Sequence, residues 1–260
     1  MKTGKIEQLP VSAFVITWNE ESNIRRCLES VCWAKEIVVV DSFSSDRTVE
    51  VARGFTDKVY HHQWQGMVQQ KGYALSKTTQ PWAMMIDADE EVSPELAASI
   101  RRAIIEDDTE IDGFLVARRT SYVGNWIYHG GWYPDRKLRL FRRDRGRIAG
   151  RNPHDRVVVN GKTRRLSGDL LHYNYPSISN QLETIDRFST IVTQETRMAW
   201  RDVRLAEMIA KPIAKFFTCY FIKQGYLDGV RGLIIAVASS FYVFLKYAKL
   251  WERDLRAGRE

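Results

Sequence analysis

The chain has 260 residues, of which 44% are hydrophobic and 12% aromatic, and its formal net charge is +7 at pH 7. This length and apolar content support one large domain, or a domain with an appendage, and exclude an intrinsically disordered chain. The basic excess favours an anionic partner, such as a nucleotide diphosphate, an anionic membrane surface or nucleic acid. The three cysteines form no C-x-x-C pair, so a disulfide framework and a zinc site are disfavoured and a reducing cytoplasm is expected.

Apolar runs alternate with helical patterns through the first hundred residues. The expected strands are 11–18, 37–40, 58–60 and 82–86, and the expected helices begin near Asn23, Thr48, Met67 and Ser93. This alternation predicts a mainly parallel sheet with helices on both faces. No G-x-G-x-x-G follows the first strand and no G-x-x-x-x-G-K-[ST] occurs, so a dinucleotide-binding domain and a P-loop NTPase are disfavoured.

The character of the sequence changes after Asp112. Strands are expected at 113–117 and 137–141, with an aromatic and glycine-rich loop at 122–135 between them, and 157–162 indicates a hairpin with an Asn-Gly turn. These elements predict an antiparallel extension that shapes a second pocket. We therefore expect a catalytic domain over 10–177, with a nucleotide-sugar-binding half at 10–105 and an acceptor-binding half at 106–177.

The remaining residues, 178–260, are expected to form a helical C-terminal segment. Its uncharged run, 232–245, is shorter than the roughly 20 residues that a transmembrane helix needs. Aromatic residues alternate with Lys and Arg along the segment. Two interpretations are open: helices packed on the catalytic domain, or a basic hairpin in the membrane interface. Association between copies of the chain is compatible with either.

Acidic and amide side chains follow three of the expected parallel strands. The carboxyl ends of such strands meet at one edge of a sheet, where ligands bind. Asp87 and Asp89 lie two residues apart, so in an extended segment they share a face, a spacing that suits one divalent ion shared with a diphosphate. A solvated acidic turn is the better explanation of a lone D-x-D, but the recurrence at successive strand ends favours a ligand site. The strand-end residues are Asn19, Glu20, Asp41, Asp87 and Asp89.

Three segments in combination resemble the GT-A inverting glycosyltransferases of family 2. They are Thr17-Trp18-Asn19-Glu20, the run VVVDSFSSDRT at 38–48 and Asp87-Ala88-Asp89-Glu90, and the likeness covers about residues 11–105. Residues 131–135, 137–143 and 152–155 are similar to the branch that contains lipopolysaccharide core β-glucosyltransferases. That branch usually has His-Glu where this chain has His154-Asp155, which keeps a carboxylate but shortens it by one methylene.

The resemblance implies a GT-A α/β fold and an inverting transfer of a hexose. The donor would be a UDP-sugar, with glucose as the sugar, and the acceptor a saccharide or glycolipid such as the lipopolysaccharide inner core. The cofactor would be Mg²⁺ or Mn²⁺. The enzyme would act at the inner face of the cytoplasmic membrane, peripherally and against an anionic surface, and no nucleic-acid partner is expected.

The resemblance also implies roles for individual residues. Asp155 would be the catalytic base, Asp89 would hold the metal, and Asp87 would contact the ribose or the metal shell. Asp41 would bind the uracil. The residues expected at the nucleotide are Thr17, Asn19, Glu20, Asp41, Ser44, Lys71 and Asp87, and those expected at the acceptor or a phosphate are Trp132, Tyr133, Arg139 and His154.

Three rival functions stay open. A sugar-1-phosphate nucleotidyltransferase also uses a parallel sheet with metal-binding carboxylates, but it usually has a glycine-rich loop after its first strand, where this chain has residues 17–20. A polyprenyl-phosphate glycosyltransferase shares the N-terminal half and uses a lipid phosphate as acceptor. A non-catalytic nucleotide-sugar-binding module would not need both the D-x-D and Asp155.

Overall fold

The computed structural model describes residues 8–152, 154–196, 198–200 and 205–258, without the side chain of His154. The chain forms two compact units. Unit 1 runs to Arg118 and resumes over Arg136–His172, and unit 2 comprises Arg119–Asp135 and the chain from Tyr173 onward. Two long strands, β6 (Ile111–Tyr122) and β11 (Lys162–Tyr175), pass from one unit into the other.

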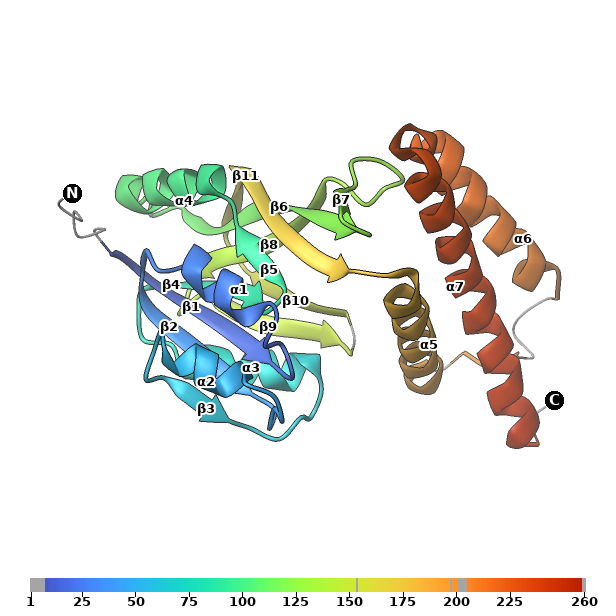
Figure 1. The fold of residues 1–260 in the computed structure, drawn as a ribbon, viewed down its shortest axis with the longest axis horizontal. Helices are drawn as coiled ribbons and strands as arrows, with labels where there is room; N and C mark the ends of the chain where they lie inside the picture. The colour runs from blue at the N-terminus through green and yellow to red at the C-terminus, as the bar shows by residue number, and fades with distance from the viewer. Residues whose placement is uncertain (1–7, 153, 197, 201–204, 259–260) are drawn as a thin grey trace. The chain divides into compact units, whose positions relative to one another are not determined.

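The first half of unit 1 is the predicted parallel sheet with its crossover helices (Figure 1). The strand order is β3-β2-β1-β4, and each of these neighbouring pairs is parallel. The strands are β1 (Leu9–Thr17), β2 (Ala34–Asp41), β3 (Val59–His61) and β4 (Trp82–Asp87). The helices are α1 (Ile24–Ser30), α2 (Thr48–Arg53), α3 (Met67–Ser76) and α4 (Pro94–Glu106).

Alternate side chains of these strands build a core on each face of the sheet. On β2, Ile37 and Val39 pack in the cluster that also contains side chains of α1, α2 and α4. Val38 and Val40 point to the other face and pack in the cluster that contains Ala74 of α3. Helices therefore cover both faces, which explains why the strands are apolar throughout rather than alternating.

An antiparallel extension completes the sheet, in the order β4-β8-β6-β11-β5. It adds β8 (Asp135–Arg142), antiparallel to β4, and the short β5 (Glu90–Val92), antiparallel to β11. The expected hairpin at 157–162 is wrong. Its Asn-Gly turn joins β10 (His154–Val159) to β11, but β10 pairs with β9 (Gly146–Arg151) in a separate two-stranded sheet. The turn chemistry marks a chain reversal without deciding which strands pair.

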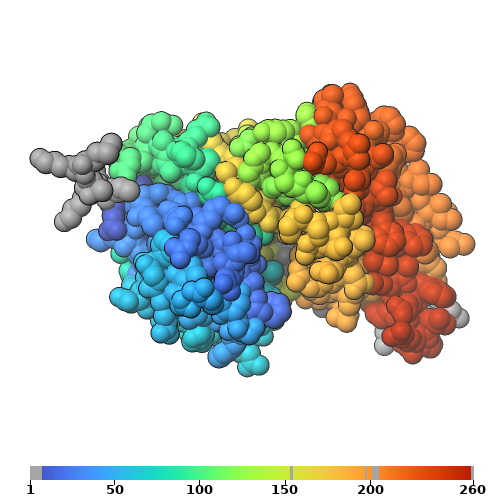
Figure 2. Space-filling view, viewed as in Figure 1, coloured from blue at the N-terminus to red at the C-terminus, as the bar shows by residue number. Residues whose placement is uncertain are grey.

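Unit 2 contains the C-terminal helices and the aromatic loop. Its elements are β7 (Asn125–Trp126), α5 (Ile178–Glu195), α6 (Leu205–Phe217), η2 (Thr218–Ile222), η3 (Gly225–Asp228) and α7 (Gly229–Arg256). Helices α6 and α7 lie in direct contact with each other (orange and red, Figure 2). The Asp228 carboxylate accepts hydrogen bonds from the backbone N–H groups of Tyr128 and His129, at 3.3 and 2.8 Å.

The predicted α/β architecture is confirmed: a parallel sheet, an antiparallel extension and a helical C-terminal segment. The proposed functional boundary between 177 and 178 stays a prediction. The compact units divide the chain differently, because 119–135 and 173–177 group with the C-terminal helices.

A buried acid stabilises the edge of the sheet remote from the strand ends considered below. Glu36 on β2 is 6% exposed and accepts hydrogen bonds from Ser12, Lys58 and Thr79. Burial alone would raise the pKa of Glu36, but these hydrogen bonds lower it from 4.5 to about 2.

This pKa predicts an acid-dependent loss of stability. The contribution of Glu36 is complete above pH 4.5 and lost as the pH falls towards 2, with a size of about 3 kcal/mol. Urea unfolding should therefore show Glu36→Gln to be less stable than wild type at pH 7, with the difference shrinking between pH 4.5 and 2. An unfolding free-energy difference that is the same at pH 7 and pH 3 would contradict this account.

Candidate active site

The register of the parallel strands brings the predicted strand-end residues to one edge of the sheet. Thr17 lies opposite Asp41 on β2, and Ile16 lies opposite Asp87 on β4. The side chains that follow these strands therefore share one rim, as the sequence pattern predicted.

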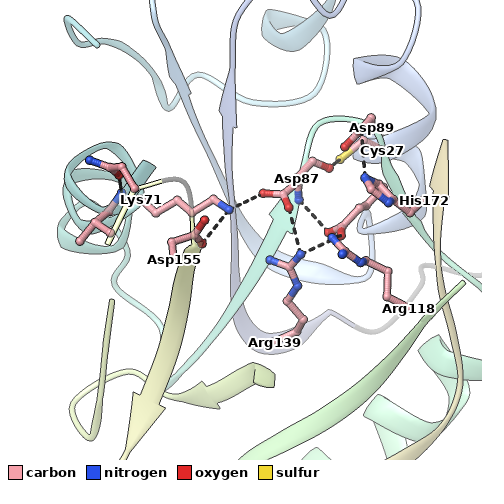
Figure 3. Close-up of polar contacts among 11 residues, drawn as sticks. Cys27, Lys71, Asp87, Asp89, Arg118, Arg139, Asp155 and His172 are labelled. Atoms are coloured by element: carbon pink, nitrogen blue, oxygen red, sulfur yellow. Dashed lines mark hydrogen bonds and ion pairs between the residues drawn. The ribbon is translucent and has the colours of Figure 1, made fainter. Parts of the chain in front are cut away.

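Lys71 links two of the predicted site carboxylates (Figure 3). Its Nζ lies 2.8 Å from Oδ1 of Asp87 and 2.9 Å from Oδ2 of Asp155, and the residue is 4% exposed. Lys71 comes from α3, Asp87 from the end of β4, and Asp155 from β10. The Asn152 side chain, in the turn before β10, accepts a hydrogen bond from the Val68 N–H of α3 at 3.1 Å, which ties that turn to the helix.

Arg139 forms an ion pair with the other oxygen of Asp87. Its Nη2 lies 2.9 Å from Asp87 Oδ2 and 2.7 Å from Glu90 Oε1. Glu90 is fully buried, accepts from the Asp87 N–H at 3.0 Å, and lies 3.6 Å from Nη1 of Arg118. Arg139 is itself 3% exposed and contacts the site's own carboxylates, and its predicted contact with an acceptor or phosphate stays a prediction.

The paired charges set the ionisation of this cluster. Burial would raise the pKa of Asp87, but Lys71 and Arg139 outweigh burial and hold it well below its usual range. Burial would lower the pKa of Lys71, but Asp87 and Asp155 raise it above its usual value. Likewise, Glu90 and Asp87 raise the pKa of Arg139 despite its burial. Lys71, Arg139 and Asp87 are therefore all charged at neutral pH.

Asp89 has a different partner. Its Oδ2 lies 3.2 Å from Nε2 of His172 on β11. Burial would raise the pKa of Asp89, but the charge of His172 and its hydrogen bond lower it. Asp89 is thus an ionised carboxylate whose side chain is 21% exposed.

A divalent cation fits Asp89 better than Asp87. Both oxygens of Asp87 face the cations Lys71 and Arg139, whereas Asp89 has one oxygen paired with His172. Among the described residues no three His, Cys, Asp or Glu side chains cluster so as to hold a metal by themselves. Such a site suits an ion like Mg²⁺ that takes one or two carboxylates and completes its shell with waters and substrate phosphates.

The loops after β1 and β2 are bonded to each other at the same rim. Ser45 N–H donates to Asn19 Oδ1 at 2.8 Å, Asn19 N–H donates to Ser44 Oγ at 2.8 Å, and Glu20 N–H donates to Thr48 Oγ1 at 2.8 Å. Asn19 has a φ of 52°, a left-handed conformation that Asn tolerates better than most residues. Burial raises the pKa of Glu20, although a hydrogen bond from Asn23 opposes this.

Asp41, Thr17 and Lys71 are the most enclosed of the predicted nucleotide residues. Asp41 is fully buried, and its carboxylate accepts from the Ser44 N–H at 2.9 Å and the Ser44 hydroxyl at 2.5 Å. Thr17 is 4% exposed, and its Oγ1 has no hydrogen-bond partner among the described residues.

The contacts of the described residues do not test the other three predicted acceptor residues. Trp132 and Tyr133 belong to unit 2, where Trp132 packs on Tyr122 and Tyr175, and Tyr133 lies against Tyr128. The His154 side chain lies outside the described residues, although its backbone pairs with Arg151. Their roles stay predictions.

Sequence reasoning missed Glu90, Arg118 and His172. Glu90 looked like one more acid of the turn after β4, but it begins the short strand β5 and points inward. His172 carried a usable signal, because it lies two residues after the buried Leu170 and so faces the same side of β11. The position of Arg118 near Glu90 depends on strand order, which the sequence pattern did not supply.

The burial of this cluster predicts a large cost for removing Arg139. In Arg139→Met, Glu90 would lose its 2.7 Å partner while remaining buried, so we expect a loss of about 3–5 kcal/mol in unfolding free energy. Chemical denaturation measures it. The control is Arg47→Met, which removes a solvent-exposed pair with Glu50 and should change the unfolding free energy far less. Equal losses of unfolding free energy in the two variants would show that burial of the ion pair does not set the cost.

Comparisons with known proteins fit this geometry. A model described as "Glycosyl transferase family 2" matches residues 12–165. The chain is 32% identical to the lipopolysaccharide core biosynthesis glycosyltransferase LpsC of Rhizobium meliloti, over 98% of this chain and 96% of that one. It is 29% identical to an uncharacterized glycosyltransferase of Rickettsia typhi, over 95% and 88%.

Among solved structures, TarS 1-349 of S. aureus in complex with UDP-GlcNAc is similar, at 14% identity and a TM-score of 0.49, covering 96% of this chain and 92% of that one. The mannosyltransferase PcManGT of Pyrobaculum calidifontis, in complex with GDP-Man and Mn²⁺, has 15% identity and a TM-score of 0.49, with coverages of 96% and 76%. At this level of similarity, no conclusion about this chain follows from either.

Proposed function

The chain belongs to glycosyl transferase family 2, and from this premise we propose that it moves a hexose from a UDP-sugar to a saccharide acceptor with inversion. Glucose is the sugar that the sequence resemblance favours, and the product is then a β-glycoside. The relationship to LpsC along nearly the whole chain supports an acceptor in lipopolysaccharide core biosynthesis.

One observation supports this proposal most directly. The Lys71 ammonium lies within hydrogen-bonding distance of both Asp155 and Asp87. The candidate base therefore lies beside the strand end where a donor's diphosphate belongs. Asp155 takes the proton of the acceptor hydroxyl, whose oxygen forms a bond to the anomeric carbon. The bond from that carbon to the diphosphate oxygen breaks, and the electron pair leaves with the UDP.

The leaving UDP gains negative charge, which cationic groups stabilise. Lys71 is the ammonium nearest to both site carboxylates, and we assign it to the donor diphosphate. Asp89, supported by His172, would hold Mg²⁺ or Mn²⁺. A bound ion would act as a Lewis acid on the diphosphate oxygens.

Asp155→Asn tests the catalytic assignment. The amide keeps the shape of the side chain but takes up no proton, so we expect transfer from UDP-glucose to fall by about 10²–10⁴-fold. UDP affinity, measured by calorimetry, should stay near wild type. Asp144→Asn, at an exposed carboxylate of the same unit, is the matched control and should leave both quantities unchanged.

The same variant distinguishes the proposed function from its main rival, a polyprenyl-phosphate glycosyltransferase. A lipid phosphate acceptor already carries a negatively charged oxygen and needs no base. Unchanged transfer in Asp155→Asn would therefore remove Asp155 from its role and favour a polyprenyl-phosphate acceptor. A wild-type chain that binds no nucleotide sugar at all would contradict the proposal that this chain is a glycosyltransferase.

We also propose that unit 2 docks on an anionic membrane at the inner face of the cytoplasmic membrane. Helix α6 exposes apolar side chains one turn apart, and the η2–η3 turn continues the apolar surface with Ile222 (75% exposed) and Leu227 (55% exposed). The α6 series is Leu205, Ile209, Ile213 and Phe217. Lys215 and Lys223 flank this surface, the combination that favours a headgroup interface.

Composition allows a deeper insertion as well. Of the described residues, the helical stretch Gly225–Arg256 is long and apolar enough to cross a membrane, by length and composition. Length and composition alone are weak support for a span, and Arg231, Lys246 and Lys249 lie within the stretch. We favour an interfacial position for that reason.

Ile222→Asp tests the membrane proposal. A carboxylate at this exposed position should oppose both apolar insertion and the anionic surface, so cosedimentation with phosphatidylglycerol vesicles should drop several-fold. Ile105→Asp is the matched control, because Ile105 is 70% exposed on α4 in unit 1. Equal vesicle binding of wild type and Ile222→Asp, or equal loss in the two variants, would contradict the proposal.

A further inference from the structure

Helix α7 leaves one narrow apolar stripe uncovered. The helix packs on α5 and α6 within unit 2, and its buried Tyr247 and Leu250 lie against Met208 of α6 (Figure 1). On another side of α7, seven large apolar side chains are between 38% and 74% exposed. We call them the α7 stripe: Val230, Leu233, Val237, Phe241, Phe244, Trp251 and Leu255. At about 100° per residue, they stay within roughly a quarter of the helix circumference.

The α7 stripe has the spacing of a seam between two helices. From Val237 onward the steps alternate between four and three residues, through Phe241, Phe244, Ala248, Trp251 and Leu255. This mean period of 3.5 residues is that of coiled coils. At 1.5 Å per residue the stripe is about 38 Å long. A second helix of similar length and pattern therefore fits along it.

Two charged residues flank the α7 stripe near its opposite ends. Arg231 lies ten residues before Phe241, and Glu252 lies eight residues after Phe244, on the same side of the stripe. Nε of Arg231 is buried and has no hydrogen-bond partner among the described residues. Glu252 keeps 50% of its side chain exposed and pairs with Arg256 at 2.6 Å. The two opposite charges are nearly equidistant from the centre of the stripe.

We propose that two copies of this chain dimerise through the α7 stripe, with their α7 helices antiparallel. The stripe is then its own partner, as an interface with twofold symmetry requires. Val230 of each copy meets Leu255 of the other. The stacked rings of Phe241 and Phe244, whose centroids lie 6.5 Å apart, meet those of the second copy at the centre.

The flanking charges set the orientation of the two helices. In an antiparallel pair, Arg231 of each copy lies near Glu252 of the other, so both ends of the interface gain an attractive contact. In a parallel pair, Arg231 would face a second Arg231. Like charges at that distance repel, so the antiparallel pair is favoured.

The same charges favour a second copy over lipid as the cover of the α7 stripe. An anionic membrane repels a carboxylate, and Glu252 lies beside the apolar Trp251 and Leu255. The surface that we assign to the membrane, on α6 and the η2–η3 turn, is flanked by Lys215 and Lys223 and shares no residue with the stripe. The dimer therefore depends neither on that surface nor on the proposed transferase activity.

The first experiment is sedimentation equilibrium of the full chain in buffer without lipid. Wild type should reach the mass of a dimer and no higher, because a twofold interface closes on itself. Phe244→Glu should raise the dimer dissociation constant about 100-fold, since it buries two carboxylates at the centre of the interface. The matched control is Ile222→Asp, because Ile222 is 75% exposed on η2 but lies outside the stripe. It should dimerise as wild type does.

Charge reversal tests the antiparallel orientation. Arg231→Glu should weaken dimerisation about 10-fold. Adding Glu252→Arg to the same chain should restore it, because the charges of the pair are exchanged rather than lost. This double variant also tests the interface without a change to the apolar stripe itself.

Disulfide cross-linking tests the register. In a Cys32→Ser background, which removes the exposed native thiol, Val230→Cys chains mixed with Leu255→Cys chains should give a linked dimer under copper phenanthroline. Neither variant should cross-link alone, because in the antiparallel pair each position lies at the far end from its own copy.

Three results would overturn the proposal. The first is a wild-type chain that stays monomeric at every concentration; a loss of vesicle binding in Phe244→Glu would then show that the stripe faces lipid. The second is a Phe244→Glu variant that dimerises as tightly as wild type. The third is a parallel pair, shown by Val230→Cys chains that cross-link to one another or by an Arg231→Glu loss that Glu252→Arg does not restore.

Discussion

The structure of unit 1 depends on one buried ion network. Lys71, Arg139 and Glu90 are nearly removed from water, and burying any one of them alone would cost several kcal/mol. Asp87, with 24% of its side chain exposed, pairs with both cations. Each is tolerated only because its partners lie within 3 Å. The network therefore requires α3, the end of β4, the short β5 and β8 to hold their positions together. Asp155 joins it from β10 through Lys71.

The network also separates two carboxylates that look equivalent in the D-x-D sequence. Asp87 has both oxygens paired with cations of the protein, whereas Asp89 pairs through one oxygen with His172, and the two side chains are similarly exposed, at 24% and 21%. Asp41 likewise has partners within the protein, Ser44 and His61, and its role at the uracil stays a prediction.

Local sequence patterns were sufficient to predict much of the fold. The helices α2, α3 and α4 begin where helices were predicted, near Thr48, Met67 and Ser93, and Ser93 caps α4 by accepting the Leu96 N–H. The apolar runs located β1, β2 and β4 because parallel strands are buried on both faces. The Asn-Gly turn failed as a hairpin signal, since partner choice depends on which other strand, here β9, offers a better-matched edge.

The sequence by itself determined the family, the alternating α/β half and the carboxylates at the strand ends, because these follow from local periodicity and from short motifs. Only the tertiary structure decided which charges neutralise which. The contacts of Glu90 with Arg139, Asp89 with His172 and Asp155 with Lys71 join residues 49, 83 and 84 positions apart. Such pairs depend on strand order and burial, and the free energy of a buried charge depends on a neighbour that no local pattern identifies.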